Sequence, residues 1–295
     1  MTLFAGRRCR NLMVPVFAAV WLAACAPIDM LNALIPGEGY HVVKDVPYGD
    51  GPRHKLDIYL PDSPGPKPAP VIVFFYGGSW TSGERGEYKF VGEALASRGF
   101  IAVVPDYRHH PEGLFPGFVE DGGAAVAWTS AHVAEYGGDA GKIVVMGHSA
   151  GAHIAALLAL VPHFVADKGG PEDAIKGFVG LAGPYSFDPL AFRGSREVFA
   201  RLDDIDSARP VTFVRTDAPP MLLMHGDDDG TVGPYNSHDM AAALAKAGAR
   251  YELRTYADTG HVGLILALAK PFQGNGLILD RVASFVRGLF APPTE

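Results

Sequence analysis

The chain has 295 residues, of which 48% are hydrophobic and 19% charged, with a formal net charge of −7 at pH 7. This apolar fraction is typical of a globular protein and excludes a wholly disordered chain, while the many Gly and Pro residues show no collagen-like period. Lys and Arg form no cluster beyond the first ten residues. A nucleic-acid partner is therefore not expected, because binding phosphates needs a basic face.

The N-terminal segment carries the features of an export signal. Three arginines between positions 7 and 10 precede an apolar run over residues 12–24. This run is too short to span about 30 Å of hydrocarbon as a helix, which takes roughly twenty residues. A basic start, a short apolar core and small residues at its end are typical of a secretory signal peptide.

The apolar run ends in Leu22-Ala23-Ala24-Cys25, which resembles a bacterial lipobox. The resemblance implies cleavage of the signal peptide, residues 1–24, and acylation of Cys25, with residues 25–40 as a tether. The expected location is the periplasmic side of the cell envelope, at the outer membrane because Ala26 follows the cysteine. An ordinary signal peptide cut near Ala24 or Ala26, with Cys25 incidental, is the alternative. Cleavage would remove Cys9 and leave no cysteine pair for an internal disulfide.

Residues 41–293 are predicted to form one domain in which strands alternate with helices. Residues 41–48 and 55–60 alternate polar and apolar side chains, as half-exposed strands do. Later apolar runs predict strands buried on both faces at 71–76, 101–104, 143–146, 178–181 and 221–224, and a further strand is predicted at 251–257. Helices are expected near 87–98, 118–136, 150–161, 236–248 and 277–290. This order predicts an α/β fold with a mostly parallel sheet flanked by helices.

Residues 186–217 break this alternation and carry mixed charges. We expect them to form an insertion over the carboxyl edge of the sheet, as a lid. The aromatic residues Trp80, Tyr185, Phe187 and Phe192 either line an acyl pocket or pack in the core or lid. Asp106 and Arg108, at the end of a predicted strand, are expected to form a buried structural pair.

Gly147-His148-Ser149-Ala150-Gly151 follows a predicted buried strand and opens a predicted helix. In that context G-x-S-x-G predicts a nucleophile elbow, a turn so sharp that side chains at the two glycine positions would clash. Ser149 would present its hydroxyl above the sheet. The N–H group of Ala150, at the helix start, favours negative charge nearby.

Tyr76-Gly77-Gly78-Ser79-Trp80 ends an earlier predicted strand. Adjacent glycines allow backbone N–H groups to turn inward, so this loop predicts an oxyanion hole made by Gly77, Gly78 and Ser79 together with Ala150. The loop resembles the His-Gly-Gly-x-Trp loop of esterases and lipases, with Tyr76 in place of the usual histidine. Because backbone groups are the donors, this substitution leaves the prediction intact, and Tyr76 would orient the loop or line the pocket.

A general base and an acid complete the predicted site. His261 is the last of the eleven histidines and lies in a loop between a predicted strand and a closing helix. The acid should come between Ser149 and His261 in the chain. The pattern H-G-x-x-D-x-x-V, familiar from α/β-hydrolases, selects Asp229, with Asp227 and Asp228 as alternatives. Three consecutive carboxylates lack the alternate spacing of a calcium loop, so no metal is expected.

Over residues 40–290 the chain resembles the α/β-hydrolases of the carboxylesterase/lipase superfamily. The feruloyl-esterase-like and arylformamidase-like bacterial esterases are the most similar group, and the oxyanion loop resembles that of isoprenylcysteine methylesterases. The resemblance implies a serine carboxylesterase that hydrolyses small esters through Ser149, His261 and Asp229, without a cofactor. Three alternatives stay open on the same fold: an aryl amide or formamide hydrolase, an acyltransferase, and a catalytically inactive binding protein.

Overall fold

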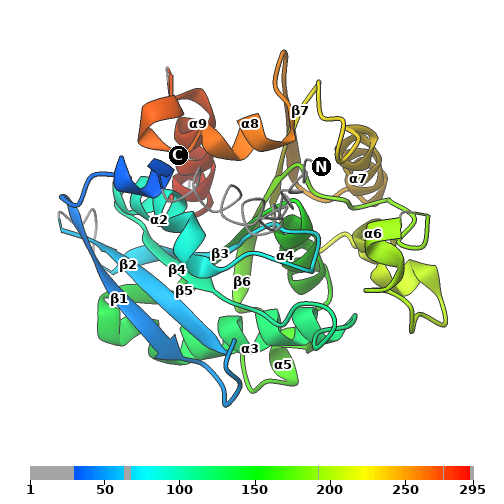
Figure 1. The fold of residues 1–295 in the computed structure, drawn as a ribbon, viewed down its shortest axis with the longest axis horizontal. Coiled ribbons are helices and arrows are strands. Elements are labelled where there is room, and N and C mark those ends of the chain that lie inside the picture. The colour runs from blue at the N-terminus through cyan, green and yellow to red at the C-terminus, as the bar shows by residue number, and fades with distance from the viewer. Residues whose placement is uncertain (1–29, 63–67, 192, 275, 293–295) are drawn as a thin grey trace, which may run out of the picture.

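The computed structural model describes residues 30–62, 68–191, 193–274 and 276–292. They form one eight-stranded sheet in the order β1-β2-β4-β3-β5-β6-β7-β8 (Figure 1). The strands are β1 (Tyr40–Pro47), β2 (Lys55–Pro61), β3 (Ala69–Phe75), β4 (Ile101–Pro105), β5 (Gly138–His148), β6 (Ile175–Leu181), β7 (Met221–Gly226) and β8 (Tyr251–Tyr256).

Strand β2 is antiparallel to both of its neighbours, β1 and β4, and all other pairs are parallel. The chain leaves β3 toward β4 on one side and returns to β5 on the other side of β3. The loops after β3 and β5 therefore diverge at the carboxyl edge of the sheet. Such a switch in strand order is where open α/β sheets bind their ligands.

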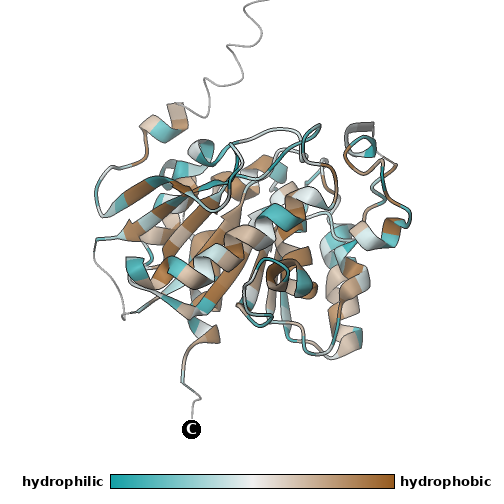
Figure 2. Ribbon diagram, turned by 90° about the horizontal axis from the view of Figure 1, so that it is seen from below, coloured by the Kyte–Doolittle hydropathy of each residue, from teal (hydrophilic) through white to brown (hydrophobic). Residues whose placement is uncertain are grey.

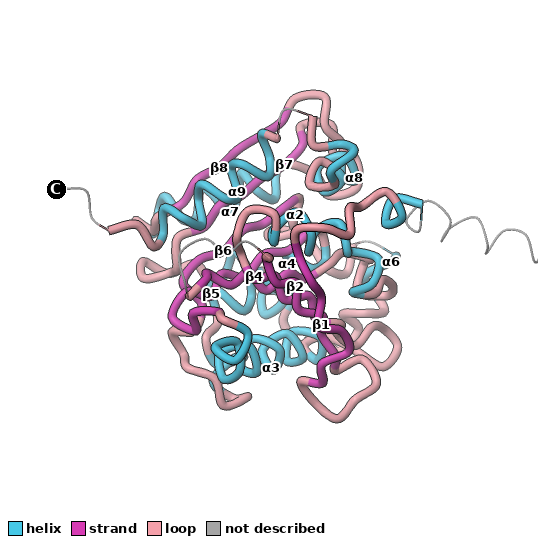
Figure 3. Tube along the Cα trace, turned by 90° about the vertical axis from the view of Figure 1, so that its left-hand side faces the viewer, coloured by secondary structure: helices cyan, strands magenta, loops and turns pink. Residues whose placement is uncertain are grey.

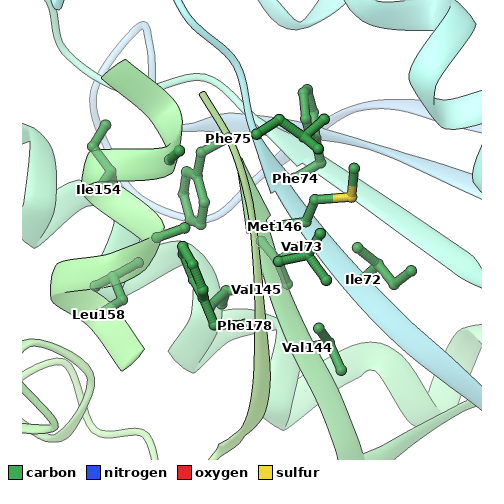
Figure 4. Close-up of a cluster of buried hydrophobic side chains, with 14 of the residues drawn as sticks. Ile72, Val73, Phe74, Phe75, Val144, Val145, Met146, Ile154, Leu158 and Phe178 are labelled. Atoms are coloured by element: carbon green, nitrogen blue, oxygen red, sulfur yellow. The ribbon is translucent and has the colours of Figure 1, made fainter. Parts of the chain in front are cut away.

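Helices cover both faces of the sheet. On one face lie α2 (Lys89–Ala96) and α9 (Leu277–Leu289), which contact each other, and on the other lie α3 (Gly117–His132) and α4 (Ala150–Leu160). Figure 4 shows that strand side chains point to both faces of the sheet: Phe75 and Phe178 point toward α4, and Phe74 and Met146 point away from it. The remaining long helix is α7 (Tyr235–Ala247), which packs on β7 and β8.

These observations confirm the predicted α/β fold and its element order, and the hydropathy colouring shows the apolar strands enclosed by the helices (Figure 2). One detail was wrong. Strand β2 was expected to be half-exposed, but its residues from Leu56 to Leu60 are all buried. The polar member of its alternation, Asp57, is buried because it accepts a hydrogen bond from Arg85 Nε at 2.9 Å.

The expected tether and lid both contain residues that pack against the core. Leu31 and Ile35 are buried, and Asn32 donates hydrogen bonds to the carbonyls of Gly86 and Glu87. In the segment between β6 and β7, Phe199 and Ala208 are buried. Movement of that segment as a lid stays a prediction. The proposed lipidation site Cys25 and the aromatic Phe192 lie outside the described residues.

Candidate active site

The turn between β5 and α4 has the strained geometry expected of a nucleophile elbow. Ser149 has φ 55° and ψ −123°, a conformation that non-glycine residues rarely adopt. A Cβ atom on Gly147 would lie 2.3 Å from the Gly151 carbonyl oxygen, and one on Gly151 would lie 2.0 Å from the Phe75 carbonyl oxygen. Only glycine fits at either position, which is the physical reason for the G-x-S-x-G spacing.

His261 and Asp229 come together from two neighbouring loops. Asp229 follows β7, and His261 is the first residue of α8 (His261–Leu266), after β8. His261 Nδ1 donates to Asp229 Oδ2 at 2.7 Å, and the other carboxylate oxygen accepts the amides of Thr231 and Val232 at 2.9 and 2.8 Å. Asp229 is thus held in place on both sides, and it orients the imidazole.

The electrostatics keep Asp229 ionised. Burial alone would raise the pKa of Asp229, but the hydrogen bond from His261 and those from the Val232 and Thr231 amides outweigh burial and hold the pKa below its usual value. An ionised carboxylate next to Nδ1–H stabilises a proton taken up at the opposite ring nitrogen. His261 is therefore placed to act as a general base.

The two alternative acids lie elsewhere. Asp227 and Asp228 are exposed, whereas Asp229 is buried. The backbone amides of Asp227 and Asp228 bind the carbonyls of Tyr256 and Thr259, which joins the β7 loop to the chain leading to His261. Among the described residues, no group of three or more His, Cys, Asp or Glu side chains is arranged to hold a metal ion.

Sequence reasoning missed the role of His225, the last residue but one of β7. Its Nε2 donates to the Val232 carbonyl at 2.8 Å, and its Nδ1 accepts the Ser237 hydroxyl at 2.7 Å. His225 therefore fixes the turn that carries Asp229. Burial lowers the pKa of His225, so the ring stays neutral and both bonds persist. His225 is the first residue of the H-G-x-x-D-x-x-V pattern, and this position in the pattern is the sequence feature that could have predicted its role.

His148, the neighbour of Ser149, also contacts His261. Its Nε2 lies 3.2 Å from the His261 carbonyl oxygen, and the two rings are 4.7 Å apart. Burial lowers the pKa of His148 to about 3. A neutral ring at this place packs against His261 without adding a competing charge.

The loop after β3, the predicted oxyanion loop, has an unusual backbone conformation. Gly78, Ser79 and Trp80 all have positive φ, at 128°, 53° and 59°. The Gly78 carbonyl accepts the amides of Thr81 and Ser82, and a Cβ on Gly78 would lie 2.2 Å from the Ser82 carbonyl oxygen. The Gly77 backbone instead faces Tyr88: burial raises the pKa of the Tyr88 phenol to about 12, and a hydrogen bond from Gly77 opposes that rise.

Tyr76 does not line the pocket; it is fully buried and anchors this loop. Its hydroxyl donates to Asp106 Oδ1 at 2.8 Å and accepts from Arg53 Nη2 at 2.9 Å. The same Arg53 nitrogen donates to the Gly83 carbonyl at 2.7 Å. The tyrosine that replaces the family histidine thus connects the two ends of the loop through one guanidinium group.

The expected pair between Asp106 and Arg108 does not form. Asp106 pairs with Arg85 and with Arg53, whereas Arg108 binds Asp121 at 2.7 Å. Asp121 comes from α3, which the sequence offers no reason to place beside Arg108. Asp106 is buried, as expected, but its partners are Arg85 and Arg53, and the carboxylate that pairs with Arg108 is the buried Asp121.

A cavity of about 330 Å³ opens at the elbow. Its lining includes Ser149, Ala150 and Ser79, together with Trp80, Phe187, Ser195, Thr231 and Tyr235. Trp80 stacks on Phe187 with ring centroids 5.7 Å apart. Tyr185, by contrast, is fully buried against Gly180 and Gly183. A second cavity, of about 530 Å³, between α3 and residues 201–213 contains none of the predicted site residues.

Comparison with known proteins identifies the family of the chain. The BD-FAE family model matches residues 56–244. Over 277 residues the chain is 34% identical to the rice (Oryza sativa subsp. japonica) protein named "Probable isoprenylcysteine alpha-carbonyl methylesterase ICME", which covers 83% of this chain and 66% of that protein. It is 34% identical to Esterase LipQ of Mycobacterium tuberculosis, covering 70% of this chain and 53% of that one. The chain thus spans between about half and two thirds of these relatives.

Among solved structures, a thermophilic esterase from the Planctomycetes species Thermogutta terrifontis, with propionate bound, superimposes with a TM-score of 0.71. The two are 27% identical, and the match covers 88% of this chain and 98% of that one. The family model covers more than half of the chain, and the sheet order agrees with the fold of that structure. The chain belongs to the BD-FAE family of α/β-hydrolase-fold proteins.

Proposed function

We propose that this protein is a serine carboxylesterase with Ser149 as nucleophile, His261 as general base and Asp229 as the acid that orients it. The observation that carries the proposal is the 2.7 Å hydrogen bond between His261 Nδ1 and Asp229 Oδ2, formed beside the strained Ser149 turn. The esterase names of the relatives support the same reaction class.

The reaction follows from these positions. His261 Nε2 takes the proton of Ser149 as Oγ attacks the ester carbonyl carbon, and ionised Asp229 stabilises the imidazolium that forms. The imidazolium then protonates the leaving alcohol. Water attacks the acyl-enzyme with His261 again as base, which releases the acid and restores Ser149.

The developing oxyanion is held by backbone N–H groups. We assign this role to Ser79 and Ala150, which line the pocket, with Gly78 as a third donor. Ala150 is the first residue of α4, so its N–H has no acceptor within the helix. Each such donor contributes about 3–4 kcal/mol to the transition state. The Gly77 amide is directed to Tyr88 and is left out.

The test is hydrolysis of p-nitrophenyl esters from acetyl to dodecanoyl by the wild-type protein and by Ser149→Ala. A cavity of about 330 Å³ is near the lower end for ligand pockets, so short acyl chains should react fastest. Activity that survives in Ser149→Ala would rule out the mechanism. Product analysis with added alcohol would detect acyl transfer, and a formanilide substrate would detect amide hydrolysis.

We also propose that Cys25 is acylated and holds the protein at the bacterial outer membrane, on its periplasmic side. The support is the Leu22-Ala23-Ala24-Cys25 sequence. In the described part of the chain, no helix is long and apolar enough to cross a membrane. Metabolic labelling with palmitate should mark the wild-type chain and leave Cys25→Ser unmarked. Equal labelling of both would contradict the proposal.

A further inference from the structure

The two edge strands of the sheet differ in how they are protected against pairing with another chain. Strand β1 is interrupted by a bulge between Val43 and Val46, where Asp45 has a φ of 59° and its amide donates to Asp57 Oδ1 at 2.9 Å. Bulges of this kind bend and twist an edge strand and so oppose edge-to-edge pairing. Strand β8, at the other edge, pairs with β7 without a register shift over its whole length and contains no proline.

One side of the β8 backbone is open. Figure 3 shows β8 as the outermost strand, beyond β7. The amide of Met221 in β7 donates to the Arg250 carbonyl at 3.0 Å, so the backbone of Arg250 and of every second residue after it faces β7. The backbone N–H and C=O groups that face away from the sheet are therefore those of Tyr251, Leu253 and Thr255. They form a template for a further strand.

The side chains of β8 carry opposite charges two positions apart. Arg254 Nε donates to Glu252 Oε1 at 2.6 Å, and Glu252 also pairs with Arg281 of α9, so Glu252 and Arg254 lie on one face of the strand. Within the described part of the chain, Nε is the one nitrogen of the Arg254 guanidinium with a hydrogen-bond partner, and 54% of this side chain is exposed. Its two terminal nitrogens are free to bind a further carboxylate.

We infer that β8 pairs antiparallel with β8 of a second copy of this chain, which joins the two sheets across a two-fold axis. Outward-facing residues form the hydrogen-bonded pairs of such a ladder, so Leu253 would pair with Leu253 of the second copy, and Tyr251 with Thr255. Glu252 of each copy then lies opposite Arg254 of the other. Their Cα atoms would be about 4.5 Å apart, because this is a non-hydrogen-bonded pair.

The charges select this register over its neighbours. A shift by two residues in one direction would place Glu252 opposite Glu252, and a shift in the other direction would place Arg254 opposite Arg254. Like charges directly opposite each other destabilise a strand pair, whereas opposite charges stabilise it. The pairing would also cover the Tyr251 side chain, which is 39% exposed. None of the described residues that line the active-site pocket belongs to β8, so the inference is independent of the proposed function.

The first experiment tests the register by disulfide formation. In the dimer, positions 251 and 255 of different copies have Cα atoms about 5.5 Å apart, within reach of a disulfide. Each position is about 14 Å from the same position in the other copy, which is out of reach. The full-length protein is purified in a mild detergent and oxidised. The double variant Tyr251→Cys/Thr255→Cys should form a covalent dimer, and the two single variants, as matched controls, should not. The unsubstituted chain shows any dimer formed through Cys9 or Cys25. Equal cross-linking of double and single variants, or none in the double variant, would overturn the inference.

The second experiment measures the dissociation constant by sedimentation equilibrium in density-matched detergent. Arg254→Glu places carboxylates opposite each other on both sides of the axis, and we expect the dissociation constant to rise about tenfold. Lys44→Glu is the control, because it makes the same change in charge at an exposed position of the other edge strand, and it should have no effect. Equal effects of the two variants would contradict the inference. So would a wild-type chain that is monomeric at about 100 µM, well above the dissociation constant of a specific dimer.

Mixing two charge variants tests the pairing directly. Each of Arg254→Glu and Glu252→Arg places like charges opposite each other in its own dimer. A heterodimer of the two has opposite charges at both places, so the mixture should associate about as tightly as the wild type. Thermal unfolding followed by circular dichroism confirms that each variant is folded. A mixture that associates no better than its separate components would rule out the pairing of Glu252 with Arg254 of a second copy.

Discussion

Ser149 occupies a left-handed backbone conformation that costs energy, and its surroundings are built to hold it there. Its amide donates to the Leu181 carbonyl at 2.9 Å, and its carbonyl accepts from the first turn of α4. Gly147 and Gly151 allow the two arms of the turn to approach each other and β3. Backbone strain of this kind persists only where neighbouring structure over-determines it, and it presents the hydroxyl at the pocket.

The glycine requirement at position 151 can be tested by stability. In Gly151→Ala the new methyl group would overlap a carbonyl oxygen of β3, which has no room to move in the centre of the sheet, so we expect a loss of more than about 3 kcal/mol in the free energy of unfolding. Gly288→Ala in α9 is the control: its methyl group meets nothing within 4 Å and should stabilise the helix by about 0.5–1 kcal/mol. Urea denaturation measures both, and similar values for the two variants would contradict the elbow geometry.

The acid assignment has its own test. Asp229→Asn should lower kcat about 10⁴-fold, because an amide neither stabilises the imidazolium nor enforces the Nδ1–H tautomer. Asp228→Asn, at the exposed neighbouring position, should stay within about threefold of wild type, since surface changes away from the site have small effects. Steady-state kinetics on p-nitrophenyl acetate compares them. The reverse order of losses would transfer the role of the acid to Asp228.

At the scale of elements, the oxyanion loop depends on a buried network that joins four parts of the chain. Arg53, from the β1–β2 turn, donates to Tyr76 and Gly83 at the two ends of the loop and to the Tyr107 carbonyl after β4. The Tyr107 hydroxyl in turn donates to the Tyr76 carbonyl at 2.8 Å. This network explains why a loop with three successive positive φ angles keeps one conformation.

Tyr76→Phe tests the network while it keeps the ring packing. Removing the hydroxyl takes one partner from Arg53 and one from Asp106, and we expect a loss of about 1–3 kcal/mol in the free energy of unfolding. If the network positions the oxyanion donors, kcat should also fall about tenfold with little change in KM, because the lost interaction acts mainly in the transition state. A loss of stability with unchanged kcat would show that Tyr76 stabilises the fold but does not position the oxyanion donors.

At the scale of the whole molecule, several buried histidines are held neutral. Burial lowers the pKa of His148 to about 3 and the pKa values of His109 and His153 to about 4. His153 lies in an aromatic cluster with Trp80 and Phe199, and its Nε2 donates to the Ala208 carbonyl at 2.7 Å. Protonating any of these rings in place would bury a charge.

The consequence is a fold that weakens in acid. A histidine whose pKa is lower in the folded than in the unfolded state binds more protons when unfolded, so stability falls as the pH drops below about 6.5. For His153, with a folded value of about 4, the loss between pH 7 and pH 5 is about 2 kcal/mol. His153→Gln keeps an N–H donor for the Ala208 carbonyl but does not titrate in this range. Its free energy of unfolding should therefore fall by about 2 kcal/mol less between pH 7 and pH 5 than that of the wild type. Urea denaturation at pH 5, 6 and 7 measures the difference, and parallel pH profiles would contradict it.

The amino-acid sequence by itself determined the element order, the elbow and the glycine-rich loop. These features leave local signals in the sequence: buried strands read as apolar runs, and the two glycines of the elbow stand two residues before and two residues after Ser149. The crowding at Gly147 comes from Gly151 within the same turn, whereas the crowding at Gly151 comes from Phe75 of β3. His261 and Asp229 could be selected by their order along the chain, because parallel strands bring successive loops to one edge of the sheet.

Only the tertiary structure decided which side chains meet. The H-G-x-x-D-x-x-V pattern selected Asp229 by resemblance alone, and the structure supplies the physical reason. Asp229 is buried and meets His261, 32 positions away, whereas Asp227 and Asp228 are exposed. The partners of Asp106 and Arg108, the support from His225 and the burial of β2 likewise depend on segments that are distant in sequence.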